Sequence, residues 1–153
     1  MTPVEIDQFL RDHHFMHLAT ARPGGMPHLV SMWYGLIDGH VAFWSYAKAQ
    51  KILNLRRNPQ LACQIEDGQH PSEVRGIEIE GTARFVEDLA EVAAVGRAVN
   101  TQGFGQAPTD EALERMGVRK RVAVIVEPVR IASWDHRKIP GGYLGSAIPT
   151  TLA

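Results

Sequence analysis

The sequence has little that would tie the protein to a special environment. Cys63 is the single cysteine among 153 residues, so no disulfide can form within the chain, which fits a reducing compartment. No apolar run reaches the ~18 residues of a membrane span, and the N-terminus lacks the apolar segment of a secretory signal. The 16 Lys and Arg residues balance 17 Asp and Glu residues, which gives no sign of nucleic acid or membrane partners. We therefore predict a cytoplasmic protein.

Familiar catalytic and metal-binding motifs are also missing. There is no Ser/His/Asp or Cys/His nucleophile arrangement, no GxGxxG after a strand and no Walker-type loop. His13 and His17 lie four residues apart, but they straddle a predicted change from helix to strand, so this spacing does not put them on one face. With no other ligand type at suitable spacing, we predict no metal site. The sequence indicates no catalytic residue.

Hydrophobic periodicity predicts one mainly β (α+β) domain over residues 1–137, followed by an irregular tail over 138–153. Asp38-Gly39 is a strong hairpin signal between two of its strands. The expected strands are 15–21, 26–37, 40–45, 61–66, 77–86 and a last strand region of two segments, 122–126 and 129–134, around Pro128. The expected helices are 3–12, 48–58, 89–99 and 111–116, with loops over 67–76 and 101–110. We predict a six-stranded antiparallel barrel with flanking helices across its openings.

The stretch 41–59 organises the chain. Its first half is β-branched and aromatic, and its second half has apolar residues at helical spacing up to Pro59. The junction brings together the Ser45 hydroxyl, the free N–H groups of a new helix, and the side chains of Lys48 and Lys51. A helix N-terminus already favours anions, and lysines in its first turn oppose the helix dipole unless something negative binds there. We interpret the junction as a phosphate site for a cofactor.

Three motifs now carry a family resemblance: LATARPGGMPH leading into a long strand, DGHVAFWS, and KILNLRRNP. Across about residues 15–137 the chain resembles the pyridoxamine-5′-phosphate-oxidase-like split β-barrel family, also called the flavin/deazaflavin oxidoreductase superfamily. It is particularly similar to the branch that binds the deazaflavin coenzyme F420. The motifs are fairly specific for the fold and less specific for the cofactor.

The resemblance implies a homodimer with two cofactor sites in grooves between the subunits. The cofactor ring would lie along residues 27–33, and the phosphate would contact Ser45 and Lys51. The implied cofactor-binding residues are His28, Val30, Ser31, Met32, Trp33, Ser45, Lys51, Arg56 and Arg57. Which face of the strand lines the groove stays open, so residues from both faces are included.

The predicted function is hydride transfer between F420 and a small conjugated organic molecule. Dependence on flavin mononucleotide (FMN) is the alternative, although Ala49 stands where FMN-binding relatives usually carry Ser or Arg. A third reading is a non-catalytic carrier of a flavin, deazaflavin or haem, because this fold serves both roles. The motifs that would mark vitamin B6 oxidation are not found near the C-terminus.

Overall fold

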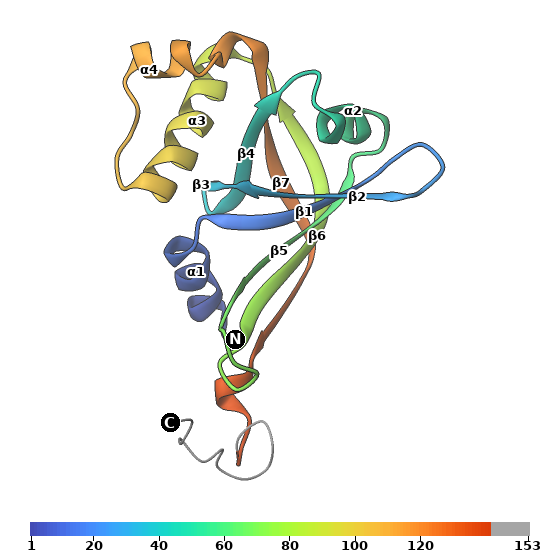
Figure 1. Cartoon of the computed structure of the whole chain (residues 1–153), viewed down its shortest axis with the longest axis vertical. Helices are drawn as coiled ribbons and strands as arrows, with labels where there is room; N and C mark the ends of the chain where they lie inside the picture. Colours follow the sequence, from blue (N-terminus) through green and yellow to red (C-terminus); the bar gives the residue numbers. More distant parts are fainter. Residues whose placement is uncertain (142–153) are drawn as a thin grey trace.

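The protein is a curled antiparallel sheet of seven strands with helices packed around it (Figure 1). The computed structural model describes residues 1–141. The strands are β1 (Phe15–Ala21), β2 (Pro27–Trp33), β3 (Gly35–Ile37), β4 (His40–Tyr46), β5 (Gln60–Asp67), β6 (Arg75–Val86) and β7 (Arg121–Asp135). The helices are α1 (Pro3–Asp12), α2 (Gln50–Arg57), α3 (Leu89–Phe104) and α4 (Asp110–Arg115), with 3-10 helices η1 (Val118–Lys120) and η2 (His136–Lys138). The strand order is β2-β1-β5-β6-β7-β4-β3.

This architecture confirms the predicted mainly β fold, an antiparallel split barrel with flanking helices, but with seven strands rather than six. The expected strand 26–37 is interrupted at Tyr34, whose buried N–H donates to the carbonyl of His14 over 3.1 Å. The two parts become β2, which pairs with β1, and β3, which pairs with β4. The segments on either side of Pro128 form one strand, because a register shift opposite Gly81 absorbs the proline.

Two clusters of buried residues lie on opposite faces of β4 and β7. The cluster inside the curl joins residues from α1, α2 and the strands, for example Phe43 with Leu18 and Ile77. The other cluster packs α3, α4 and η1 against the sheet, with Ala42 and Trp44 facing them. Successive residues of β4 thus face different partners, as the period of a strand requires. Burial on both faces holds the end of β4 rigidly in place.

Two helix predictions were wrong at their ends. The second helix begins at Gln50 rather than at Lys48, so Lys48 lies in the turn before it. The third helix runs on to Phe104, into the stretch 101–110 that was predicted to be a loop. Gln102 explains the extension, because its side-chain amide donates to the carbonyl of Leu10 over 2.7 Å and ties the last turn to α1.

The chain beyond β7 begins with η2, whose Lys138 pairs with Glu5 of α1 at 2.6 Å. The rest of the predicted tail, from residue 142 onward, lies outside the described residues. Within residues 1–141, no helix combines the length and apolar character needed to cross a membrane.

Candidate functional site: a cationic strand–helix junction

A buried hydroxyl and a half-buried ammonium lie where β4 ends and α2 begins. Ser45 is 6% exposed, and the Lys51 ammonium donates to its Oγ over 3.3 Å. Ala49 provides no side-chain cap for the helix, and the first turn holds no acidic residue. Within residues 1–141, the backbone N–H groups of Gln50 and Lys51 have no hydrogen-bond acceptor. The free N–H groups carry partial positive charge and the ammonium a full positive charge, so this junction favours an anion.

A chain of polar side chains fixes α2 against β1 and β2. The Gln50 amide donates to Asn54 Oδ1 over 2.8 Å, and the Asn54 amide donates to Thr20 Oγ1 over 3.0 Å. Asn54 and Thr20 are buried, and Thr20 pairs in register with His28, whose Nδ1 lies 3.5 Å from its hydroxyl. Buried polar groups with satisfied bonds specify one arrangement, so the start of α2 is held at a fixed position relative to β2.

Cations without a carboxylate partner lie at this junction and near the other end of α2. Ten of the 16 lysines and arginines form ion pairs with carboxylates within residues 1–141. We call the other six, none of which has a carboxylate partner among those residues, the cationic corner: Arg22, Lys48, Lys51, Arg57, Lys120 and Arg121. Four of them lie at the exit of β4, where Ala47 N–H donates to the Lys120 carbonyl over 3.0 Å. A chain of net charge −1 therefore carries a strongly positive local surface.

The cations of the cationic corner affect one another and His28 electrostatically. Burial and then the charge of Arg121 lower the pKa of Lys51. Partial burial, followed by the charges of Arg22 and Lys51, lowers the pKa of His28. Arg121 is held in place by the faces of Trp44 and Tyr46, 4.3 and 4.1 Å from the ring centroids. The positive charges are thus close enough to repel one another, and an anion would relieve that repulsion.

Strand β2 borders this junction and presents two different faces. It is an edge strand, so one side of its backbone has no partner strand within residues 1–141. The residues that face inward and are half-buried are His28, Val30 and Met32. The residues that face outward and are exposed are Leu29, Ser31 and Trp33. The inward face is linked to α2 through Thr20 of β1, which His28 contacts and to which Asn54 of α2 donates.

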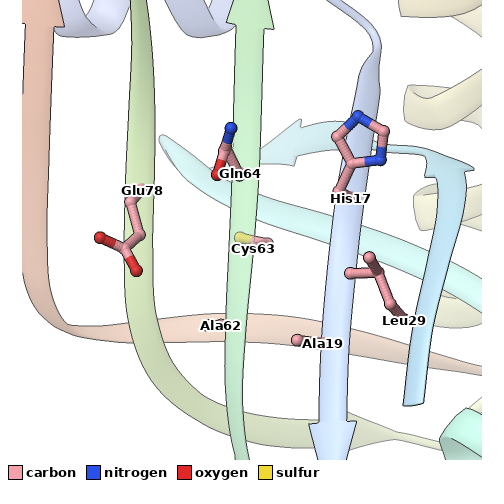
Figure 2. A pocket seen from close by; sticks show the side chains of 7 residues that line it. All are labelled: His17, Ala19, Leu29, Ala62, Cys63, Gln64 and Glu78. Atoms are coloured by element: carbon pink, nitrogen blue, oxygen red, sulfur yellow. The ribbon is translucent and has the colours of Figure 1, made fainter. Parts of the chain in front are cut away.

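The outward face of the sheet carries a shallow hollow of about 400 Å³ over β1, β2, β5 and β6. Figure 2 shows His17 and Leu29 on one side of it and Glu78 on the other, with the small Ala19 and Ala62 between them. Leu29 is 66% exposed, and His17 Nδ1 lies 3.1 Å from the Ser31 hydroxyl. Phe15 and Trp33 are exposed on the same face, and apolar side chains that gather on one exposed face are typical of a contact surface.

The predicted site residues therefore separate into groups. Ser45, Lys51 and His28 converge on the junction. Arg56 instead pairs with Glu87 and stacks on Phe85, with its guanidinium 4.6 Å from the ring centroid. Arg57 donates to the carbonyl of Ala21, at the opposite end of α2. Val30 and Met32 pack on the core, and Ser31 and Trp33 lie on the outer face.

Sequence reasoning missed Arg121, Lys120 and Arg22. Arg121 reaches the junction only because β7 pairs with β4, which sets it opposite Tyr46. No local pattern in the sequence indicates that pairing. Arg22 lies in the turn after β1, next to the carbonyl that Arg57 contacts. Within residues 1–141, no group of three potential metal ligands comes together.

A curled antiparallel sheet of seven strands with helices packed around it is a split β-barrel. The chain belongs to the pyridoxamine 5′-phosphate oxidase family, whose sequence model matches residues 2–135. This finding confirms the resemblance carried by the three motifs. It also places the chain in a superfamily of flavin-type oxidoreductases.

Solved structures agree with this assignment. A conserved hypothetical protein from Mycobacterium tuberculosis is 37% identical over 99% of this chain and 95% of its own, with a TM-score of 0.85. A protein described as an F420 reductase is 27% identical over 82% of this chain and 94% of its own, with a TM-score of 0.66. A FAD-binding protein from Mesorhizobium loti, 18% identical over 87% and 94% of the two chains with a TM-score of 0.66, shares the fold. The comparison with curated proteins gives no match.

Proposed function

We propose that this protein is an oxidoreductase that binds F420 and transfers hydride between that cofactor and a small conjugated organic molecule. The cationic corner is the observation that carries the proposal, because its members at the exit of β4 have no carboxylate partner among residues 1–141 and so favour a ligand of several negative charges. F420 has a phosphate and a long anionic tail. The similarity to an F420 reductase over 82% of the chain supports the same choice.

The residues present fit such a ligand. Lys51, the Ser45 hydroxyl and the free N–H groups at the start of α2 would hold the phosphate, and Arg121 would hold further negative charge. The free backbone edge of β2 offers N–H and C=O groups to a flat ring. When bound, F420 supplies the hydride chemistry. The protein's part is to bind, to orient and to exclude water, which needs no acid–base motif.

FMN is the alternative cofactor, and it carries one phosphate without a long anionic tail. A single phosphate would leave much of the cationic corner without a partner, which favours F420 over FMN. The uncapped Ala49 is consistent with this preference, because it provides no additional side-chain donor to a phosphate. A non-catalytic carrier on the same barrel would bind the cofactor in the same way and differ only in turnover.

The test is a titration of purified protein with F420 and, separately, with FMN, followed by fluorescence quenching. We expect saturable binding of F420, weaker binding of FMN, and oxidation of reduced F420 when a panel of enones is added. Binding of FMN alone would replace the proposal with the FMN-dependent reading. Binding of F420 without turnover across the panel would favour a carrier.

We also propose that two copies of the chain associate through the outer sheet face and complete the cofactor groove between them. The support is the exposed apolar surface formed by Leu29 and Trp33, 66% and 38% exposed, together with Phe15, which pairs in register with Trp33. We expect light scattering to give a dimer for the wild type and a monomer for Leu29→Asp. Val4→Asp, at a 79% exposed position on α1, is the matched control that should stay dimeric. A dimeric Leu29→Asp protein would move the interface elsewhere.

A further inference from the structure

A second hollow lies on the helical side of the molecule, and its Phe104 wall borders Trp33 of the outer sheet face. It has a volume of about 400 Å³ and is bounded by the end of α3, the connection to α4, and α4 itself. Ligand pockets in proteins span roughly 300–1,000 Å³, so its size suits a small molecule. Its apolar wall consists of Phe104, Ala107, Pro108, Ala112 and Met116. We call it the α3–α4 hollow.

The walls of the α3–α4 hollow are fixed rather than collapsible. The Phe104 ring is 57% exposed, yet it meets Trp33 edge-on with ring centroids 4.5 Å apart and planes at 83°. Arg97 of α3 donates to the carbonyl of Pro108 and pairs with Asp110, which ties the connecting loop to the helix. A preformed pocket avoids the entropy cost of ordering its walls around a ligand.

One buried polar group that lines the α3–α4 hollow has an atom without a partner, whereas the amide of Gln106, which also lines the hollow, is exposed to water. Asn100 is 5% exposed, and its amide nitrogen donates to the Gly96 carbonyl over 2.7 Å. No group within residues 1–141 donates to its Oδ1. No fully enclosed side-chain nitrogen or oxygen among these residues lacks a partner, so this oxygen is not fully enclosed, and Asn100 lines the hollow. An acceptor left open in an apolar wall selects a ligand with a hydrogen-bond donor.

The charges around the hollow are already neutralised. Arg115 lines it, but its guanidinium pairs with Glu111 at 2.7 Å, and Asp110 pairs with Arg97. We infer that the α3–α4 hollow binds a neutral, planar aromatic molecule with one hydroxyl or amino donor. Phe104 contacts the ring of this molecule, and Asn100 Oδ1 accepts the hydrogen bond from its donor. This site is separate from the cationic corner, and it requires no cofactor.

The experiment is a fluorine NMR titration of the whole chain with 4-(trifluoromethyl)phenol and with its methyl ether, which has no donor. We expect saturable binding of the phenol and roughly tenfold weaker binding of the ether, the scale of one hydrogen bond. Ala112→Phe should fill the hollow and abolish binding. Ala90→Phe, at an exposed alanine in the first turn of α3, should bind like the wild type.

Asn100→Ala is tested by the ratio of its affinities for the phenol and the ether, which does not depend on how strongly the variant binds either one. Without the Asn100 oxygen, the preference for the phenol over the ether should fall to within about twofold. Equal binding of phenol and ether by the wild type, or no saturable binding of either, would overturn the inference. So would an Ala112→Phe protein that binds the phenol as Ala90→Phe does.

Discussion

Lys51→Met is the sharpest test of the cationic corner, because methionine keeps most of the aliphatic stem and removes the charge. The ammonium has three N–H donors, of which one is used on Ser45, so the others remain for an anion. A charge-assisted hydrogen bond contributes about 1.5–3 kcal/mol, which predicts a loss of roughly 10- to 150-fold in F420 affinity. Quenching of F420 fluorescence measures this directly.

Lys48→Met is the matched control. Lys48 is exposed and lies in the turn before α2, so salt and water screen it and its loss should change affinity less than about threefold. The Lys51 effect should also shrink as salt is added, because part of it is coulombic. Affinity of Lys51→Met within threefold of the wild type at low salt would refute the phosphate site.

The pH dependence of the same variant has a definite sign. Burial, then Arg121, lowers the pKa of Lys51 below its ordinary 10.5, so wild-type affinity should fall as pH rises through that lowered value. Lys51→Met should not show this fall. In the absence of ligand, the charged form of Lys51 lowers the free energy of unfolding at pH values below its lowered pKa. This loss of stability disappears as pH rises toward 10.5. The variant should therefore melt at a higher temperature than the wild type at neutral pH.

Four further variants test the same structure. Arg121→Gln should weaken F420 binding at neutral pH but raise the pKa of Lys51, so the alkaline loss of affinity moves to higher pH. Arg137 holds the pKa of Asp135 at about 2, so their ion pair stabilises the fold above pH 3.8, and this stabilisation is lost as pH falls toward 2. Arg137→Ala should therefore raise the pH midpoint of acid unfolding, followed by circular dichroism. An unmoved midpoint would contradict the pairing. A Cβ at Gly35 would lie 2.6 Å from the backbone of Ala98, so Gly35→Ala should cost roughly 1–3 kcal/mol in urea unfolding. Gly103→Ala, 3.9 Å from its nearest neighbour in a helix, should instead stabilise by up to ~1 kcal/mol.

Elements specified by local chemistry were predictable from the sequence. The first strand has the predicted bounds 15–21, and the hairpin at Asp38-Gly39 forms with both residues at positive φ. In both cases a short pattern, alternation or a turn dipeptide, determines the conformation. The contact between Ser45 and Lys51 was predictable for the same reason, since both lie within one strand–turn–helix unit.

Features set by distant contacts were not predictable. Thr101 to Phe104 extend α3 against their own propensity because Gln102 bonds to α1, 92 residues earlier in the chain. The split between β2 and β3 depends on a bond from Tyr34 to His14. Arg56 was expected near the phosphate, but Glu87, 31 residues away, takes its guanidinium. Each of these outcomes is a tertiary contact that overrides a local pattern.

The cationic corner itself shows why local and tertiary information must be combined. Elsewhere in residues 1–141 ten cations each have a carboxylate within 4.0 Å, so this sequence readily neutralises its own charges. At the exit of β4 the fold instead brings Lys51 near Arg121 from a strand 70 residues further on, and burial, then the charge of Arg121, lowers the pKa of Lys51. Such a local departure from pairing destabilises the free protein and is characteristic of functional sites. The repulsion between these cations is what an anionic cofactor would relieve on binding.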